Sequence, residues 1–329
     1  MNWVIRRFLF FILTLFVVIT STFFITSAMP GNIIDTYVSE RIREGFSVEE
    51  AYRMAQALYA INMSEPLLVR YIKYLKNLLT GNLGTSYMYS GTPVFTILIY
   101  AVPWTVFISS ISVVISFTLG IIQGLWAAYS RKSKISTLMT GTASFLMAVP
   151  NYVIATAFLL VFAYHLGIFP RGGAYDAWIR PGMNLEFVAS ALYHAVLPVM
   201  SYIVATYPGW LLLMRSNTIR VLGEDYVIAA EARGLPKSRI TYTYVARNAI
   251  IPMITNLAIS LGSIFGGATF IETIFTYPGI GMFLSQSVGA KDIPMMQGCF
   301  LLITVATITA NFIVDLLYGK IDPRIRAIR

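Results

Sequence analysis

The strongest constraint on this chain is the distribution of its charged residues, which are absent from long stretches. Phe8 to Ala28 is a run of 21 uncharged residues. As an α-helix this run spans about 31 Å, enough to cross a hydrocarbon core roughly 30 Å thick. Only 12% of the residues are charged, against about 25% in soluble domains, so an ordinary soluble enzyme is excluded. Five further uncharged stretches are each long enough for one crossing: Asn77 to Ser130, Ile135 to Pro170, Phe187 to Met214, Asn248 to Ile271 and Ile293 to Val314.

We therefore predict an all-α integral membrane protein with six transmembrane helices. The stretch from Asn77 has room for two crossings, but its first third is rich in glycine and proline. That composition indicates turns, so we place a single helix near Pro103 to Ala128. Phe8 to Ala28 follows two arginines and resembles a signal peptide in that respect. It is longer than the apolar core of a signal peptide, so we expect it to be retained as the first helix.

The basic residues predict the orientation of these helices. With the N-terminus in the cytoplasm, fifteen of the 24 Lys and Arg lie in cytoplasmic segments, and the two short outer loops hold only Arg171, Arg180 and Lys291. The other six lie in the long first outer segment, whose length exempts it from the positive-inside rule. An even number of helices returns the C-terminus to the cytoplasm. The net charge of +9 is then explained by orientation and contact with anionic lipids, and no nucleic-acid partner is expected.

The segment between the first two helices, residues 29–102, is expected to form a small helical cap outside the membrane. Ser47 and Glu50 match a capping box ahead of a helix over 48–60. A second helix between Pro66 and Gly81 has an apolar face opposite a basic one, so it should lie flat on an apolar surface. That surface is either the protein's own helix ends and the lipid headgroups, which periodicity favours, or an extracytoplasmic partner.

The cytoplasmic stretch between the fourth and fifth helices contains a short predicted helix at about residues 223–236. Glu224 and Asp225 stand at its start, where the helix dipole favours negative charge, and Gly234 closes it. So short a helix is marginal in water and needs a surface to pack on. Ala230 and Gly234 leave one side nearly bare, where a partner's backbone could approach closely. The alternative is that the helix rests on its own bundle or on lipid.

The chain lacks the motifs of other energised transporters. No glycine immediately precedes either of its Lys-Ser pairs, Lys132-Ser133 and Lys237-Ser238, so we expect no ATP hydrolysis by this chain. Glu272 and Asp315 stand at the ends of the fifth and sixth helices, where they are poorly placed to couple transport to an ion. An ion-coupled secondary transporter is thus a weaker alternative.

Metal sites and catalytic groups are not indicated either. His165 and His194 lack metal-ligand spacing and are expected to be interfacial polar residues, and Cys299 is the single cysteine. No nucleophile with an adjacent base can be identified. We therefore expect a non-catalytic chain with no cofactor and no metal, and the third alternative, a membrane-embedded enzyme, is unsupported.

Several motifs occur along almost the whole length of the chain. They are Met29-Pro30-Gly31, Pro66-Leu67, Tyr71, Tyr74-Leu75, Gly81-Asn82-Leu83-Gly84-Thr85-Ser86, Glu224-Asp225-Tyr226, Ala229-Ala230, Ala232-Arg233-Gly234-Leu235, Arg247-Asn248-Ala249, Pro252, Glu272, Phe275, Pro278-Gly279-Ile280-Gly281, Asp292, Pro294, Gly298, Asn311, Asp315, Tyr318 and Asp322-Pro323-Arg324. In this combination they resemble the integral-membrane permease subunit of ABC importers, specifically that of the dipeptide, oligopeptide and nickel branch.

The resemblance implies a type I ABC importer permease fold, with residues 1–28 as N-terminus and first helix, 29–102 as cap and 103–329 as a five-helix core. It implies a complex in the plasma membrane with a second related permease, two ATPase subunits that bind ATP and Mg²⁺, and an extracytoplasmic solute-binding protein. Expected substrates are peptides or oligosaccharides, with nickel chelates as the alternative. Pore-lining and substrate-binding residues are not assigned by the sequence.

The resemblance also assigns roles to particular residues. The short cytoplasmic helix would bind an ATPase subunit through Glu224, Asp225, Tyr226, Ala229, Ala230, Glu231, Arg233 and Gly234. The second group, in the gate region, is Glu272, Pro278, Gly279, Gly281, Asp292, Asn311 and Asp315. One departure stands out: Ile228 occupies the position where the general coupling motif has Glu before Ala-Ala. Glu231, in the next turn, is then the candidate to supply the missing carboxylate.

Overall fold

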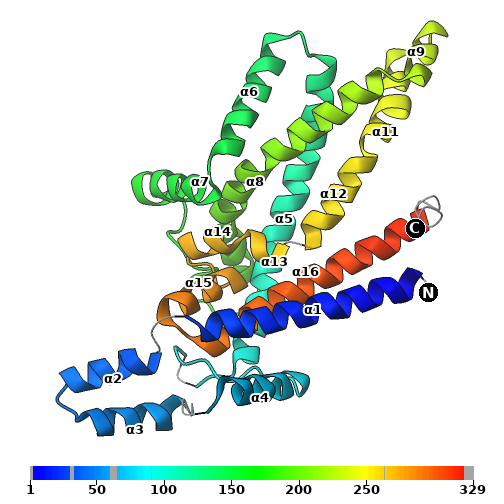
Figure 1. Cartoon of the computed structure of the whole chain (residues 1–329). Helices are drawn as coiled ribbons and strands as arrows, with labels where there is room; N and C mark the ends of the chain where they lie inside the picture. The colour runs from blue at the N-terminus through cyan, green and yellow to red at the C-terminus, as the bar shows by residue number, and fades with distance from the viewer. Residues whose placement is uncertain (1–2, 30–32, 60–64, 90, 263, 322–329) are drawn as a thin grey trace. The chain divides into compact units, whose positions relative to one another are not determined.

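The computed structural model describes residues 3–29, 33–59, 65–89, 91–262 and 264–321. Within these ranges the regular structure is helical apart from an isolated antiparallel bridge between Thr85 and Pro93. The chain divides into two compact units. The first comprises Met1–Thr105 with Pro278–Phe312, and the second comprises Val106–Tyr277 with Ile313–Arg329. Figure 1 shows the helices in chain order.

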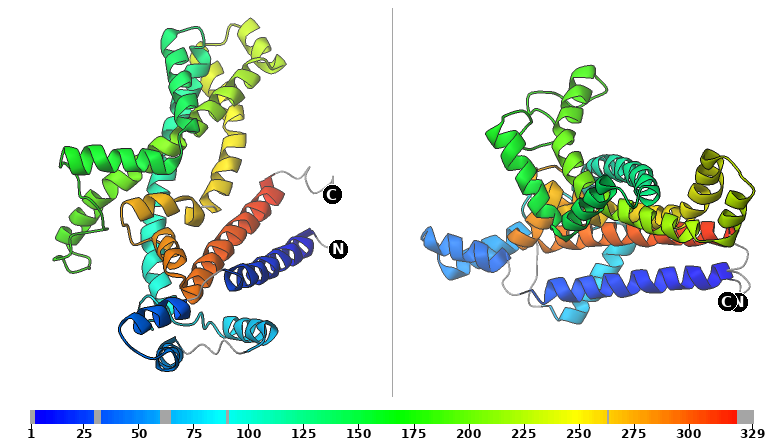
Figure 2. Two further views of the ribbon diagram at one scale, coloured as in Figure 1. Left: turned by 60° about the vertical axis from the view of Figure 1, so that its left-hand side comes forward. Right: turned by 90° about the horizontal axis from the view of Figure 1, so that it is seen from above.

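The first unit pairs a helix from the first part of the chain with the part of a late helix that ends at Phe312. Helices α1 (Trp3–Ser27) and α16 (Ile293–Ile321) run side by side in Figures 1 and 2, and the rings of Phe11 and Phe312 lie 5.5 Å apart between centroids. Buried Gln297 of α16 donates a hydrogen bond of 2.9 Å to Thr26 of α1. The other helices here are α2 (Ile33–Arg43), α3 (Val48–Tyr59), α4 (Leu67–Leu79), α15 (Ile280–Ala290) and the first part of α5 (Val94–Tyr129).

The cap contains both predicted helices. Ser47 and Glu50 form the capping box at the start of α3: the Ser47 N–H donates to Glu50 at 3.1 Å and the Glu50 N–H donates to the Ser47 hydroxyl at 3.3 Å. Hydrogen bonds from Ser47 lower the pKa of Glu50. An additional helix, α2, precedes them, and the sequence analysis did not predict it.

Helix α4 packs on α1 through its tyrosines. The hydroxyl groups of Tyr71 and Thr20 share a hydrogen bond of 2.7 Å. Tyr74 stacks on Phe23, with 5.3 Å between the ring centroids. Burial raises the pKa of Tyr74 to about 12. The tyrosines of this helix therefore pack on the protein's own helix, as expected. Ile72, on the same helix, is 59% exposed.

The second unit is built around α8 (Leu185–Leu222), a helix of 38 residues. Asn184 caps it by accepting a 2.7 Å hydrogen bond from the Phe187 N–H. The unit also contains the rest of α5, which packs against α8, and several shorter elements. These are α6 (Lys134–Ala148), α7 (Asn151–Phe158), η1 (Leu159–His165), α9 (Asp225–Ala232), α10 (Lys237–Arg239), η2 (Ile240–Ala246), α11 (Arg247–Ala249), α12 (Ile251–Gly262), α13 (Ile264–Gly267) and α14 (Thr269–Ile274).

Two glycines allow α5 and α8 to approach closely. A Cβ atom at Gly120 would lie 2.3 Å from Cβ of Trp210, and one at Gly124 would lie 2.6 Å from the Leu211 carbonyl oxygen. Both distances are far below van der Waals contact. Glycines spaced four residues apart are a known device for bringing membrane helices together. This pair was not predicted from the sequence.

Among the described residues, four helices are long and apolar enough to cross a membrane: α1, α5, α8 and α16. They coincide with four of the six predicted crossings. Helix α5 begins at Val94, earlier than the expected start near Pro103. The turn residues end at Pro93, and Pro103 lies inside the helix, a position that membrane helices tolerate.

The other two predicted crossings are not single straight helices. Lys134–Ala148 and Asn151–His165 are bent by 101° at Val149 and Pro150, and count as a fifth crossing only if taken together. Val149 is extended because the residue before a proline avoids the helical region. The stretch from Asn248 to Ile271 is divided among α11 to α14, where the longest apolar helix is Ile251–Leu261.

Candidate functional site

Helix α9 in the second unit has the predicted position and termination. It begins after Glu224, whose backbone is extended, and ends at Ala232, with Arg233 as its C-cap. Gly234 follows with φ +67°, the left-handed conformation that glycine adopts without strain. Its N–H donates to the Glu231 carbonyl at 2.9 Å, and the Leu235 N–H donates to the Ala230 carbonyl at 3.3 Å. These two bonds form a Schellman motif, so Gly234 is needed for backbone conformation.

The inner face of α9 is anchored in a hydrophobic cluster of the same unit. Val227 is 1% exposed and Ala230 is 3% exposed, and both pack with Ile240, Val245 and other buried residues. Of the two alternatives, packing on the chain's own bundle therefore holds at Ala230, whereas Gly234 is exposed and no atom lies within 4 Å of an added Cβ there. This packing supplies the surface that a helix of eight residues requires.

The outer face of α9 is open. Tyr226 is 41% exposed and Ile228 is 53% exposed, and Glu231 is also exposed. Ile228 and Glu231 are three residues apart and thus neighbours on one face of the helix. The carboxylate of Glu231 is accordingly presented on the same side as the position where the general coupling motif has Glu.

Charge is segregated along this segment. Glu224 and Asp225 are exposed at the N-terminal end of α9, and Arg233 and Lys237 are exposed beyond its C-terminal end. This arrangement complements the helix dipole. Figure 1 shows α9 near one end of α8, beside α11. The segment therefore offers a rigid helix with a mixed apolar and charged surface, held firmly on one side and free on the other.

A second set of predicted residues meets in the first unit. Asp292, which precedes α16, is fully buried. One carboxylate oxygen accepts hydrogen bonds from the Ser86 hydroxyl at 2.5 Å and the Met88 N–H at 3.0 Å, and the other accepts from the Met295 N–H at 3.1 Å. Gly84 lies against Pro294, since a Cβ atom there would be 3.4 Å from the proline. Two motifs that are far apart along the chain, residues 81–86 and 292–294, thus form one cluster.

Removing this carboxylate is expected to destabilise the protein. Replacing Asp292 with Ala leaves three donors without an acceptor. We expect this to lower the free energy of unfolding by about 3 kcal/mol. The loss is measured by thermal unfolding of the detergent-purified protein. Asp292→Asn, which keeps one carbonyl acceptor, should be less affected. Equal stability of Asp292→Ala and the wild type would contradict a structural role for this residue.

The remaining gate-region residues are divided between the two units. Glu272 of α14 is fully buried and interacts electrostatically with Tyr202 and Tyr277, all in the second unit. Pro278, Gly279 and Gly281 belong to the first unit.

At the start of α15, Gly279 has an extended backbone conformation. The N–H of Ile280 donates to the Thr105 hydroxyl at 2.8 Å. Asn311 is exposed on α16. Asp315 lies in α16 with its side chain outside those described, and residues 30–31 and 322–324 of the motifs lie outside the described residues.

One polar cluster was missed by the sequence analysis. His194 is buried 3.8 Å from the Asp176 carboxylate, and the Ser190 hydroxyl donates to Asp176 at 2.9 Å. The three residue types match a hydrolase triad, but the serine donates to the carboxylate and its separation from His194 Nδ1 is 3.5 Å. The arrangement is one of polar packing, as expected for His194. Among the described residues, no three His, Cys, Asp or Glu side chains are grouped so as to hold a metal ion.

Comparison with known proteins places these features in context. Residues 117–327 match the family described as binding-protein-dependent transport system inner membrane component. The chain is 31% identical to the oligopeptide transport system permease protein AppB of Bacillus subtilis, with 98% of each chain covered. It is 31% identical to the oligopeptide permease OppB of Haemophilus influenzae and 30% identical to the di/tripeptide permease DppB of Pseudomonas aeruginosa, with 99% of each chain covered.

Proposed function

Because the chain belongs to the family of binding-protein-dependent transport system inner membrane components, we propose that it is the permease subunit of an ABC importer that moves peptides into the cytoplasm. The observation that carries this proposal is similarity over the full length to three permeases whose names specify peptides. Permease subunits of this family are not catalytic. ATP and Mg²⁺ would be bound by two separate ATPase subunits.

The proposed arrangement has six crossings, with both termini in the cytoplasm. Helices α1, α5, α8 and α16 supply four of them, and the bent pair 134–165 and the segment 248–274 supply two broken ones. Broken helices are tolerated within a membrane where they are covered by protein or line a cavity. A second, related permease would complete the pore, and an extracytoplasmic binding protein would deliver the peptide over the cap at residues 29–102.

In this arrangement α9 is the element that couples the pore to ATP. Its outer face would occupy a groove on one ATPase subunit, with contributions from Tyr226, Ile228 and Glu231. Because Val227 and Ala230 fix α9 to the cluster that includes α8, a displacement of α9 is transmitted to that helix as a rigid movement. ATP-driven approach of the two ATPases would then close the inner gate and open the outer one, which is a two-state change biased by nucleotide.

Uptake by reconstituted vesicles tests the function. The chain, its partner permease, two ATPases and the binding protein are placed in proteoliposomes, and labelled peptide uptake is measured with and without ATP. We expect uptake only when ATP, the ATPases and the binding protein are all present. Accumulation by the chain alone down an ion gradient would instead identify a secondary transporter. Uptake restricted to oligosaccharides or nickel chelates would contradict the peptide assignment.

A further inference from the structure

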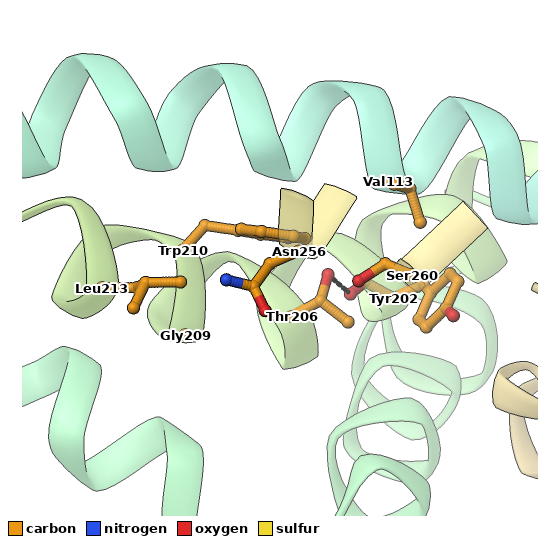
Figure 3. Close-up of a pocket in the computed structure, with 8 residues that line it drawn as sticks. All are labelled: Val113, Tyr202, Thr206, Gly209, Trp210, Leu213, Asn256 and Ser260. Atoms are coloured by element: carbon orange, nitrogen blue, oxygen red, sulfur yellow. Dashed lines mark hydrogen bonds between the residues drawn. The ribbon is translucent and has the colours of Figure 1, made fainter. Parts of the chain in front are cut away.

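The second unit contains a pocket of about 420 Å³ that none of the predicted site residues lines. Figure 3 shows side chains from three helices gathered around it: Val113 from α5, Tyr202 and Trp210 from α8, and Asn256 and Ser260 from α12. Its volume falls within the range of about 300 to 1,000 Å³ typical of small-molecule sites. Among the described residues that line it, none carries a charge at neutral pH.

Two polar groups on the wall keep hydrogen-bond acceptors available. The Asn256 Nδ2 group donates to the Pro252 carbonyl at 2.9 Å, which fixes the amide and leaves its carbonyl oxygen as an acceptor. The Thr206 hydroxyl donates to the Tyr202 carbonyl at 2.8 Å, so its proton is used and its lone pairs remain (Figure 3). These acceptors suit a ligand that offers N–H donors.

Glycine keeps this pocket open. A Cβ atom at Gly209, which also lines the pocket, would meet no atom within 4 Å. This differs from Gly120 and Gly124, where the neighbouring helix leaves no room for a side chain. Glycine weakens a helix relative to alanine, so helix packing gives no reason for glycine at position 209. The space in front of it is part of the pocket.

We propose that this pocket holds one residue of the peptide during its passage. Main-chain N–H groups would bind the oxygens of Asn256 and Thr206, and the peptide side chain would lie against Trp210 and Val113. Because the described wall is uncharged, the pocket would select by side-chain size and not by the charged termini. This inference rests on the proposed function and adds to it a contact site and the feature recognised there.

Filling the pocket tests the inference. In the complete reconstituted transporter, Gly209→Phe places a ring in the open space. We expect the ratio of trileucine uptake to trialanine uptake to fall about tenfold, since a filled pocket penalises the bulkier residue. The matched control is Gly141→Phe, because Gly141 is also a helical glycine with no atom within 4 Å of an added Cβ, but it does not line the pocket. The control should leave the ratio unchanged.

The outcomes separate the two proposals. An unchanged ratio in Gly209→Phe overturns the pocket assignment, and so does an equal loss for both peptides. If the wild-type transporter imports neither peptide, the proposed function fails regardless of Gly209. Import of oligosaccharides in place of peptides overturns the peptide chemistry of the pocket.

A second measurement covers the case in which Gly209→Phe does not assemble. The chain has a single cysteine, Cys299, and it is buried. In Gly209→Cys, the introduced thiol is labelled with a small maleimide in the assembled transporter and followed by the mass of this chain. During turnover, trileucine should slow the labelling at least about threefold, because an occupied pocket excludes the reagent. Equal labelling with and without peptide overturns the proposal.

Discussion

Reversing the charge of Glu231 is expected to weaken the association of the ATPase subunits about tenfold while the permease remains folded. The substitution is Glu231→Lys, and the measurement is the amount of ATPase that co-purifies with the permease at increasing salt. The side chain is exposed on the outer face of α9, and lysine is as good a helix former as glutamate. The variant therefore changes the surface without changing the core.

The expected loss follows from where Glu231 lies relative to Ile228. Under the proposed function, an ATPase groove that receives the carboxylate of the general motif would meet an apolar side chain at position 228 in this chain. Glu231 presents a carboxylate one turn further along the same face. The double variant Ile228→Glu with Glu231→Gln moves the carboxylate back to the general position and should recover most of the association.

A matched control lies elsewhere on the same unit. Glu186 is an exposed residue in the first turn of α8, far along the sequence from α9, so Glu186→Lys makes the same change of charge at another site. It should not alter ATPase retention. If Glu231→Lys retains the ATPases as well as Glu186→Lys does, Glu231 has no part in the coupling contact.

The success of sequence analysis at α9 has a local cause. The acidic start and the glycine at 234 act within a few residues, so they can be recognised without knowledge of the fold. The capping box at Ser47 and Glu50 is confirmed for the same reason. Long uncharged runs similarly identified α1, α5, α8 and α16, because hydrophobic length is a property of a continuous segment.

What sequence analysis missed depends on contacts between distant residues. Ser86 and Asp292 are separated by 206 positions, and nothing local pairs them. Ala230 was assigned to the ATPase contact by the family resemblance, because the residues alone cannot tell which neighbour covers a small side chain. The bend at Pro150 had a local signal, since the residue before a proline avoids the helical region, but many membrane helices contain proline without bending so far.

The close approach of α5 and α8 leads to the other large expected effect. Gly124→Val would bring side-chain atoms into the backbone of α8, where a Cβ atom alone already lies 2.6 Å from the Leu211 carbonyl oxygen and 2.7 Å from Cβ of Met214. The helices must separate, because neither the carbonyl nor a Cβ atom can move independently of its backbone. We expect a destabilisation of about 3 kcal/mol, at the upper end of the range for overpacked sites.

Separation of α5 from α8 would also disturb the cluster that anchors α9, because Phe117 and Leu125 of α5 pack against that cluster. The Gly124→Val variant should therefore lose ATPase association together with thermal stability, whereas Glu231→Lys loses association alone. Thermal unfolding and co-purification of both variants, with Gly141→Val as the control, measure this difference. Nothing lies within 4 Å of a Cβ at Gly141, so that variant should behave as the wild type. Wild-type stability of Gly124→Val would show that α5 and α8 do not pack closely in the assembled transporter.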